Sequence, residues 1–127
     1  MTTEIALERT IELSDMVAYA GATWDWHRLH YDSAWLAERG IERPVVDGQL
    51  FGALLAEMVL DWAGQGAELT ALSFRFKGFV YAGETVRCTG RVVSVVDGVT
   101  SLECNVEVVG DDARIAVAPA AAEVRLP

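Results

Sequence analysis

The segment WDWHRLHYD, residues 24–32, places both histidines of the chain, His27 and His30, between Asp25 and Asp32. Imidazole is the side chain whose unperturbed pKa lies nearest neutrality, and a nearby carboxylate can orient it. A paired aspartate and histidine could hold one water molecule and move its proton. The residue types and their spacing therefore make general acid/base chemistry the first hypothesis for this loop.

A metal site is one alternative. His27 and His30 are three residues apart, so they could share the face of a helical turn, and carboxylates are close in sequence. A catalytic zinc ion takes three protein ligands, and the chain has no histidine besides these two. Because Asp25, His27, His30 and Asp32 match no recognisable ligand spacing, we expect no metal ion and no cofactor.

A structural role is the other alternative. In this interpretation Trp24, Trp26 and Tyr31 anchor the loop in the core, and the polar residues between them are solvated. His27 is then a bystander, and Asp32 caps the helix that follows. Spacing alone does not decide between this interpretation and the acid/base pair.

Composition narrows the class of protein. The chain has 127 residues, of which 52% are hydrophobic and 23% charged, as in one folded domain over residues 1–127. Its formal net charge of −9 argues against nucleic acid as a partner, because phosphate binding requires a basic face.

The longest apolar stretch, 50–60, is too short to span a membrane. The N-terminus lacks the order of a signal peptide and two cysteines make no disulfide framework, so we expect a cytoplasmic protein.

Two short helices are expected before residue 40. The first, over 15–20, should begin at Ser14 and end at Gly21, because serine caps helix N-termini and glycine ends helices. The second, over 33–39, should begin at Asp32 for the same reason. The loop that holds both histidines lies between them.

A longer helix is expected after residue 46. Asp47 suits its N-cap and Gly64 its C-cap, which leaves about four turns between them. Its polar positions are Gln49, Glu57 and Asp61. A helix that is apolar on nearly all sides is a buried one, so we expect other elements to surround it.

The remaining elements read as strands. Their patterns cover residues 6–13, 71–79, 85–96, 99–109 and 114–126. Asp97-Gly98 is a strong hairpin signal between two of them, and Pro119 suits an edge strand or a bulge. The expected fold is α+β, with about five antiparallel strands curved around one long helix.

Three segments together resemble the MaoC-like hydratase/dehydratase family of hotdog-fold proteins, which includes the (R)-specific enoyl-CoA hydratases. The family's loop runs Gly-Asp-x-Asn-Pro-x-His-x-Asp, and Asp25, His30 and Asp32 keep its polar positions and spacing. The stretches MVAYAGAT, RPVVDGQLFGALLAE and LSFRFKGFVYAGETV resemble the helix before the loop, the central helix, and the following strand and turn. The resemblance covers about residues 9–96 and implies a hotdog, in which a curved sheet wraps a central helix.

The resemblance also implies an activity. The family adds water reversibly to 2-enoyl thioesters of CoA or acyl carrier protein and forms (3R)-hydroxyacyl thioesters. Asp25 and His30 would hold the water, with Asp25 taking its proton and His30 either orienting the water or shuttling a proton to C2. The reverse assignment is equally consistent, because the pair can titrate as a unit. The backbone N–H of Gly48, at a helix N-terminus, would stabilise the enolate-like thioester oxygen.

Two departures from the family pattern lie at the expected pocket. His27-Arg28 stands where the family has Asn-Pro, and Asp47 stands where it has the histidine before the glycine, which makes Arg28 and Asp47 candidate substrate-binding residues. Arg75 and Lys77 share one face of their strand and could meet the phosphates of the carrier. A solvated strand face is the alternative for that pair.

Hotdog domains usually pair, so the resemblance implies a homodimer or a heterodimer with another hotdog chain. Two rival functions stay open. A hotdog can be a thioesterase that hydrolyses the same thioesters, and some MaoC-like chains are non-catalytic or partner-dependent subunits of heteromeric dehydratases. The Asp25/His30 loop before the central helix favours the hydratase.

Overall fold

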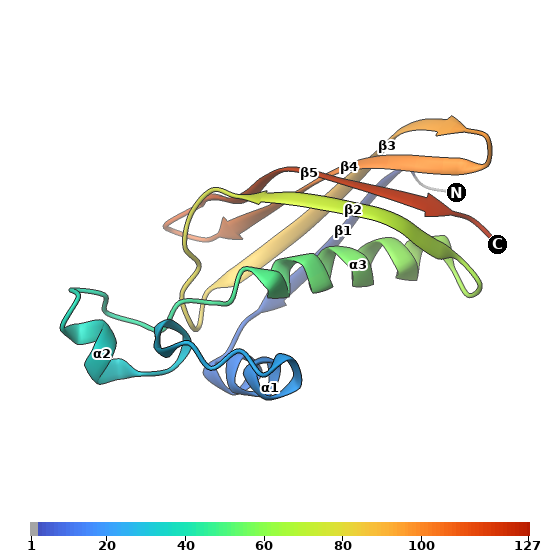
Figure 1. The fold of residues 1–127 in the computed structure, drawn as a ribbon. Helices are drawn as coiled ribbons and strands as arrows, with labels where there is room; N and C mark the ends of the chain where they lie inside the picture. The colour runs from blue at the N-terminus through green and yellow to red at the C-terminus, as the bar shows by residue number, and fades with distance from the viewer. Residues whose placement is uncertain (1–2) are drawn as a thin grey trace.

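The molecule is built on a curved antiparallel sheet with one long helix against its inner face (Figure 1). The computed structural model describes residues 3–127. The strands are β1 (Glu4–Thr10), β2 (Glu68–Phe76), β3 (Thr85–Val96), β4 (Val99–Val109) and β5 (Arg114–Arg125), and their order across the sheet is β1-β3-β4-β5-β2. The long helix is α3 (Gln49–Ala63). This arrangement confirms the predicted α+β class and hotdog fold.

The hairpin between β3 and β4 has the predicted bounds. Asp97 and Gly98 connect the strands with φ of 53° and 79°. Two consecutive positive φ values are typical of the two-residue turns that match the twist of antiparallel strands. β1 and β2 both begin earlier than expected, because Glu4 already pairs with Arg91 and Glu68 with Arg125.

Pro119 lies in a bulge of an interior strand. β5 runs between β4 and β2, so the edge alternative is wrong and the bulge is confirmed. Cys104 of β4 pairs with Ala120, whereas Val106 pairs with Val117, so two residues of β5 face one of β4. An extra residue of this kind bends a strand locally, and Pro119 has no N–H that the ladder would need.

The core lies between α3 and the inner face of the sheet. Its most buried side chains include Leu55, Val59, Val86, Leu102, Val106, Val117 and Val124. The predicted burial of α3 is confirmed except along one exposed stripe, which consists of Gln49, Ala53, Glu57 and Asp61. The helix ends at Gly64 as predicted, with φ of 96°. Within the described residues, no helix is long and apolar enough to cross a membrane.

Two glycines allow the first turns of α3 to approach the sheet closely. A Cβ atom on Gly48 would lie 2.5 Å from the ring of Phe76, and one on Gly52 would lie 2.6 Å from the ring of Phe74. The φ of Gly48 is an ordinary −60°. Space, rather than backbone conformation, therefore requires a residue without a side chain at both positions.

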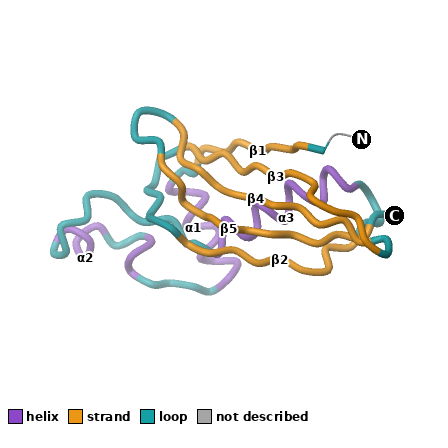
Figure 2. The backbone as a smooth tube through the Cα atoms, turned by 90° about the horizontal axis from the view of Figure 1, so that it is seen from above, coloured by secondary structure: helices purple, strands orange, loops and turns teal. Residues whose placement is uncertain are grey.

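Three smaller elements lie between β1 and α3. They are α1 (Leu13–Thr23), the 3₁₀ turn η1 (Arg28–His30) and α2 (Ser33–Ala37). Figure 2 shows α2 beyond the end of the sheet, while α1 lies closer to α3. The segment between α1 and α3 is therefore the part of the chain that the sheet covers least.

The predicted start and end of the first helix are wrong. α1 begins after Glu12, whose N–H donates to Asp15 Oδ2 at 2.9 Å. This contact is half of a reciprocal cap, which satisfies an N–H at the helix start without Ser14. The helix continues through Gly21 to Thr23, and Trp24 ends it with φ of 60°.

The other predicted caps use aspartate. Asp32 is the N-cap of α2 as expected, since its Oδ1 accepts the N–H of Trp35 at 3.1 Å. At α3 the N-cap position is Gly48 rather than Asp47. Asp47 still supplies the capping acceptor from one residue earlier, because its Oδ1 accepts the N–H of Gln49 at 3.0 Å.

Candidate active site

His30 is fixed by the backbone of a distant segment. Its ring nitrogen Nδ1 lies 2.7 Å from the carbonyl oxygen of Val45, and only 12% of its side chain is exposed. Because a carbonyl oxygen only accepts hydrogen bonds, we assign the hydrogen to Nδ1. The other ring nitrogen, Nε2, is then an acceptor in the neutral ring, and it faces the carboxylates described next.

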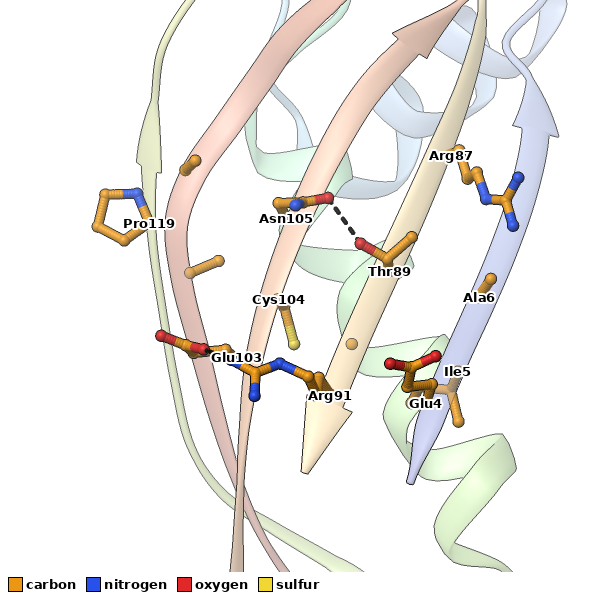
Figure 3. Close-up of a pocket in the computed structure, with 13 residues that line it drawn as sticks. Glu4, Ile5, Ala6, Arg87, Thr89, Arg91, Glu103, Cys104, Asn105 and Pro119 are labelled. Carbon is orange, nitrogen blue, oxygen red and sulfur yellow. Dashed lines mark hydrogen bonds and ion pairs between the residues drawn. The ribbon is translucent and has the colours of Figure 1, made fainter. Parts of the chain in front are cut away.

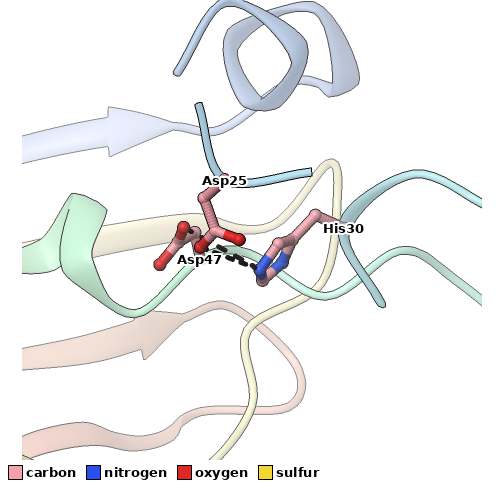
Figure 4. A group of neighbouring side chains, drawn as sticks. All are labelled: Asp25, His30 and Asp47. Carbon is pink, nitrogen blue, oxygen red and sulfur yellow. Dashed lines mark ion pairs between the residues drawn. The ribbon is translucent and has the colours of Figure 1, made fainter. Parts of the chain in front are cut away.

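Asp25 and Asp47 meet at Nε2 of His30 (Figure 4). Oδ2 of Asp25 and Oδ2 of Asp47 each lie 3.8 Å from this nitrogen. The three groups come from the loop after α1, from η1 and from the turn before α3. These separations are too long for direct hydrogen bonds, and a water molecule can bridge groups at such distances. The geometry brings the predicted Asp25/His30 pair together and adds a second carboxyl group.

The two carboxyl groups differ in burial and in pKa. The side chain of Asp25 is 45% exposed, whereas that of Asp47 is 15% exposed. Burial and then the hydrogen bond with Asp25 raise the pKa of Asp47. The same hydrogen bond lowers the pKa of Asp25. Burial, followed by the charges of both carboxylates, raises the pKa of nearby Tyr19. Asp25 is therefore the stronger acid, and Asp47 keeps a proton to higher pH.

An apolar cleft begins beside this cluster. Its volume is about 300 Å³, and it is lined by Leu29, Val45, Val46, Phe51, Phe76, Lys77, Gly78, Phe79 and Val80. Leu29 and Val46 are direct chain neighbours of His30 and Asp47. A small-molecule site typically has such an apolar lining and a few convergent polar groups. The cleft could therefore hold an apolar group next to the bridging water position.

The backbone N–H of Gly48 is available at the same place. It follows Asp47 directly at the N-terminus of α3, and within residues 3–127 it donates no hydrogen bond. A helix N-terminus carries a partial positive charge, so an N–H there stabilises an anionic oxygen. Gly48 also has a packing role, because a side chain at this position would meet the ring of Phe76.

Of the predicted cationic contacts, only Lys77 reaches the cleft. Arg28 Nε lies 3.6 Å from Asp32 Oδ2, and the side chain of Arg28 is exposed. Arg75 is exposed on β2 and does not line the cleft. Contact of Arg28, Arg75 or Lys77 with a substrate or its carrier stays a prediction.

The four residues of the metal alternative are not assembled. His27 Nδ1 accepts the N–H of Leu29 at 3.0 Å, and Asp32 caps α2. The donor atoms that do converge, within 4.8 Å of one another, belong to Asp25, His30 and Asp47. His27 therefore caps η1, and its role as a bystander in the chemistry stays a prediction.

The aromatic residues of the loop are not core anchors. Trp24 is 77% exposed, and Trp26 and Tyr31 are 40% and 41% exposed. They pack edge-to-face on one another, with ring centroids 5.9 Å apart for Trp24–Trp26 and 6.1 Å for Trp26–Tyr31. This aromatic cluster lies on the outside of the loop, because the core is already filled by α3 and the sheet.

A larger hollow than the apolar cleft lies elsewhere. It has a volume of about 680 Å³ and lies on the face of the sheet away from α3 (Figure 3). Its polar side chains are mostly paired, with Thr89 donating to Asn105 at 2.7 Å and Arg91 bound to Glu103. It contains no histidine or cysteine thiolate that could act as a base, so the Asp25/His30/Asp47 cluster is the better site for chemistry.

The role of Asp47 in this cluster was not predicted. Sequence reasoning gave Asp47 a capping role and a place at the pocket, but did not bring it to Asp25 and His30. The one available signal was its position, directly before Gly48, where the family pattern has another titratable residue. The local pattern of polar and apolar residues does not indicate that residues 25 and 47 lie close together.

Comparisons with known proteins show the family and agree with the fold. The MaoC-like domain family matches residues 1–112. The (R)-specific enoyl-CoA hydratase of Aeromonas caviae is 28% identical over 90 residues, which cover 70% of this chain and 67% of that protein. The solved structure of the A. caviae (R)-hydratase involved in PHA biosynthesis has a TM-score of 0.89 at 25% identity, covering 98% of this chain and 94% of that one. A chain of the ChsH1-ChsH2 complex from Mycobacterium tuberculosis has a TM-score of 0.85 at 25% identity. The match covers 96% of this chain and 93% of that one.

Proposed function

Because the chain belongs to the MaoC-like domain family, we propose that it catalyses the reversible hydration of 2-enoyl thioesters to (3R)-hydroxyacyl thioesters. The carrier is CoA or acyl carrier protein, and the enzyme works as a cytoplasmic homodimer or as a heterodimer with another hotdog chain. One observation carries the proposal. The Asp25 carboxylate and His30 Nε2 lie 3.8 Å apart beside an apolar cleft and the N-terminus of α3.

In this mechanism Asp25 and His30 hold the attacking water. The hydrogen bond from Nδ1 to Val45 fixes the tautomer and direction of the His30 ring, so Nε2 can accept one hydrogen of the water. The carboxylate of Asp25 accepts the other. The lowered pKa of Asp25 keeps this carboxylate ionised, so it is free to accept a proton. The water oxygen then attacks C3 of the enoyl group.

The negative charge that develops on the thioester oxygen needs a donor. The N–H of Gly48 is unoccupied within the described residues and lies at the positive end of α3. One oxyanion donor typically contributes about 3–4 kcal/mol to lowering the barrier. The cleft lined by Val46, Phe51 and Phe79 would hold the acyl chain.

A partner-dependent subunit is the second candidate. The aromatic cluster of Trp24, Trp26 and Tyr31 is exposed directly beside Asp25, where an incoming chain could cover it. The relative from the ChsH1-ChsH2 complex is part of a two-protein assembly. In this version the chemistry is unchanged, but the isolated chain is inactive until a second hotdog chain completes the cleft.

The test is turnover by the purified protein. Crotonyl-CoA and a bulky enoyl-CoA would be supplied separately, and loss of the conjugated enoyl absorbance followed with a thiol reagent present. We expect loss of absorbance without thiol release, and a (3R) product by chiral chromatography. Thiol release would instead identify a thioesterase. No turnover of either substrate by a folded protein would contradict a self-sufficient hydratase and favour the partner-dependent form.

A further inference from the structure

We propose that Asp47 is the acid of this reaction: it shares one proton with Asp25 and delivers it to C2 of the thioester. This inference rests on the proposed hydratase function and extends it, since it assigns the C2 proton to a third residue of the cluster instead of to His30. The position of Asp47 departs from the family pattern, so the assignment concerns this chain rather than the family.

The geometry offers a place for a proton inside the cluster. With the hydrogen of the ring on Nδ1, His30 Nε2 is an acceptor, and an ionised carboxylate is an acceptor only. Nε2 lies 3.8 Å from Oδ2 of Asp25 and 3.8 Å from Oδ2 of Asp47. With a neutral ring, three acceptors face one another, and a hydrogen among them, from a bridging water or from a carboxylic acid, stabilises the arrangement. Within residues 3–127, no lysine or arginine forms an ion pair with either carboxylate.

Asp47 is the better holder of that proton. Its side chain is one third as exposed as that of Asp25, at 15% against 45%, and burial disfavours the charged form. Its Oδ1 is occupied by the N–H of Gln49, which leaves Oδ2 for the hydrogen and for the cluster. The raised pKa of Asp47 and the lowered pKa of Asp25 both favour the proton on Asp47. The other titratable groups facing the pair are Tyr19 of α1 and His27 before η1.

The position of Asp47 also suits delivery to C2. If the thioester oxygen accepts the N–H of Gly48, the adjacent C2 lies next to the preceding residue, which is Asp47. The water oxygen forms the bond to C3 while its proton passes to Asp25, and the proton of Asp47 forms the C–H bond at C2. One water is consumed and no redox partner is needed. The product state has the proton on Asp25, and its return to Asp47 within the pair restores the starting state.

The first test compares Asp47→Asn with Asp32→Asn. Both aspartates cap a helix through one oxygen, which asparagine retains, but only Asp47 belongs to the cluster. We expect Asp47→Asn to lower kcat by about 10²–10⁴-fold with a nearly unchanged KM. The wild type should lose activity as pH rises, because the acid ionises, and Asp47→Asn should lack this alkaline limb. Asp32→Asn should match the wild type. An Asp47→Asn variant with wild-type kcat and pH profile would overturn the proposal.

The second test needs no turnover. Carboxyl ¹³C NMR titrations of the wild type and of Asp25→Asn follow Asp47 directly. We expect Asp47 to titrate at higher pH in the wild type than in Asp25→Asn, because the ionised neighbour is removed. Equal titration in both would exclude a shared proton. If the wild type hydrates no enoyl thioester, the acid role falls with the proposed function, whereas the shared proton is still decided by this titration.

A third experiment tests whether a shared proton or a bound metal cation balances the charges of Asp25 and Asp47. Activity after dialysis against EDTA should be unchanged, and added Zn²⁺ should not increase it. Loss of activity on chelation and recovery with Zn²⁺ would show that a cation balances these charges, and would overturn the shared proton.

Discussion

The helix–sheet core and the segment that carries the site are held together in different ways. In the core, side chains such as Leu55, Val59 and Val117 are fully buried and pack over a wide area. In the segment 24–48, single polar contacts fix the functional groups, among them the bond from His30 Nδ1 to Val45 and that from the Gln49 N–H to Asp47. Stability and chemistry should therefore respond to different substitutions.

The two regions meet at the start of α3, and the largest combined effect is expected there. Gly48→Ala and Gly52→Ala introduce the same kind of clash, at 2.5 Å from Phe76 and 2.6 Å from Phe74. Each should lower the free energy of unfolding by about 1–3 kcal/mol through overpacking. Only Gly48→Ala should also lower kcat, by about 10²–10³-fold, because it displaces the oxyanion donor.

Denaturant unfolding and steady-state kinetics would measure both effects. A Phe76→Leu substitution added to Gly48→Ala should recover stability by removing part of the clashing ring. If Gly48→Ala and Gly52→Ala reduced kcat equally, the role of Gly48 would be packing alone.

A substitution confined to the core should separate stability from chemistry. Leu55 is completely buried, so Leu55→Ala should cost about 2–5 kcal/mol of unfolding free energy by leaving a cavity. The kcat of the remaining folded protein should stay at the wild-type value. A fall in kcat at a temperature where the variant is fully folded would show that core packing controls the site.

An intermediate effect is expected at the wall of the cleft. Arg114 binds Glu84 at 2.6 Å and 2.9 Å and the carbonyl oxygen of Phe79 at 2.9 Å, and the Glu84 side chain is only 10% exposed. Arg114→Ala should cost about 3 kcal/mol, since it leaves a nearly buried carboxylate unpaired. The exposed pair Arg91–Glu103 is the matched control, and Arg91→Ala should cost less than about 1 kcal/mol.

Thermal denaturation of the two arginine variants would compare them. Arg114→Ala should in addition raise KM for long acyl chains, because Phe79 lines the cleft. Equal destabilisation by both variants would contradict a special role for Arg114.

The smallest effect expected is a pH dependence of stability with opposite signs at the two carboxyl groups. The folded-state pKa of Asp47 is raised above 3.8, so its contribution to stability is present at low pH and is lost as pH rises through the folded pKa. The pKa of Asp25 is lowered below 3.8, so its contribution is present above that value and is lost as pH falls. Relative to wild type, Asp47→Asn should gain stability and Asp25→Asn should lose it as pH rises. Urea unfolding between pH 3 and 8 would measure this, and parallel curves would contradict it.

Local patterns in the sequence predicted the elements that depend on neighbouring residues. The alternation in 85–96 and 99–109, with Asp97-Gly98 between, gave the β3–β4 hairpin with its bounds. The start of α1 was missed, because Glu12 and Asp15 form a reciprocal cap at a helix start where serine is a more usual capping residue.

The site could be predicted only in part, because it is made by contacts between distant segments. The resemblance supplied Asp25 and His30 from one loop, and the structure brings them together. Asp47 could not be placed, since its approach to residue 25 depends on the turn before α3 and on the tether between His30 and Val45. The exposure of Trp24 was also unpredictable, because aromatic residues are commonly buried and here the core is filled without it.

The most direct measurement is the hydration rate of crotonyl-CoA by the wild type and by two matched pairs of variants. Asp25→Asn and His30→Ala alter the proposed water-holding pair, whereas Asp32→Asn and His27→Ala alter the neighbouring cap and the bystander histidine. Measured at a temperature where every variant is folded, the first pair should lose about 10²–10⁴-fold in kcat/KM, and the second pair should stay within a few-fold of wild type. Near-full activity in either Asp25→Asn or His30→Ala would contradict the assignment of the site.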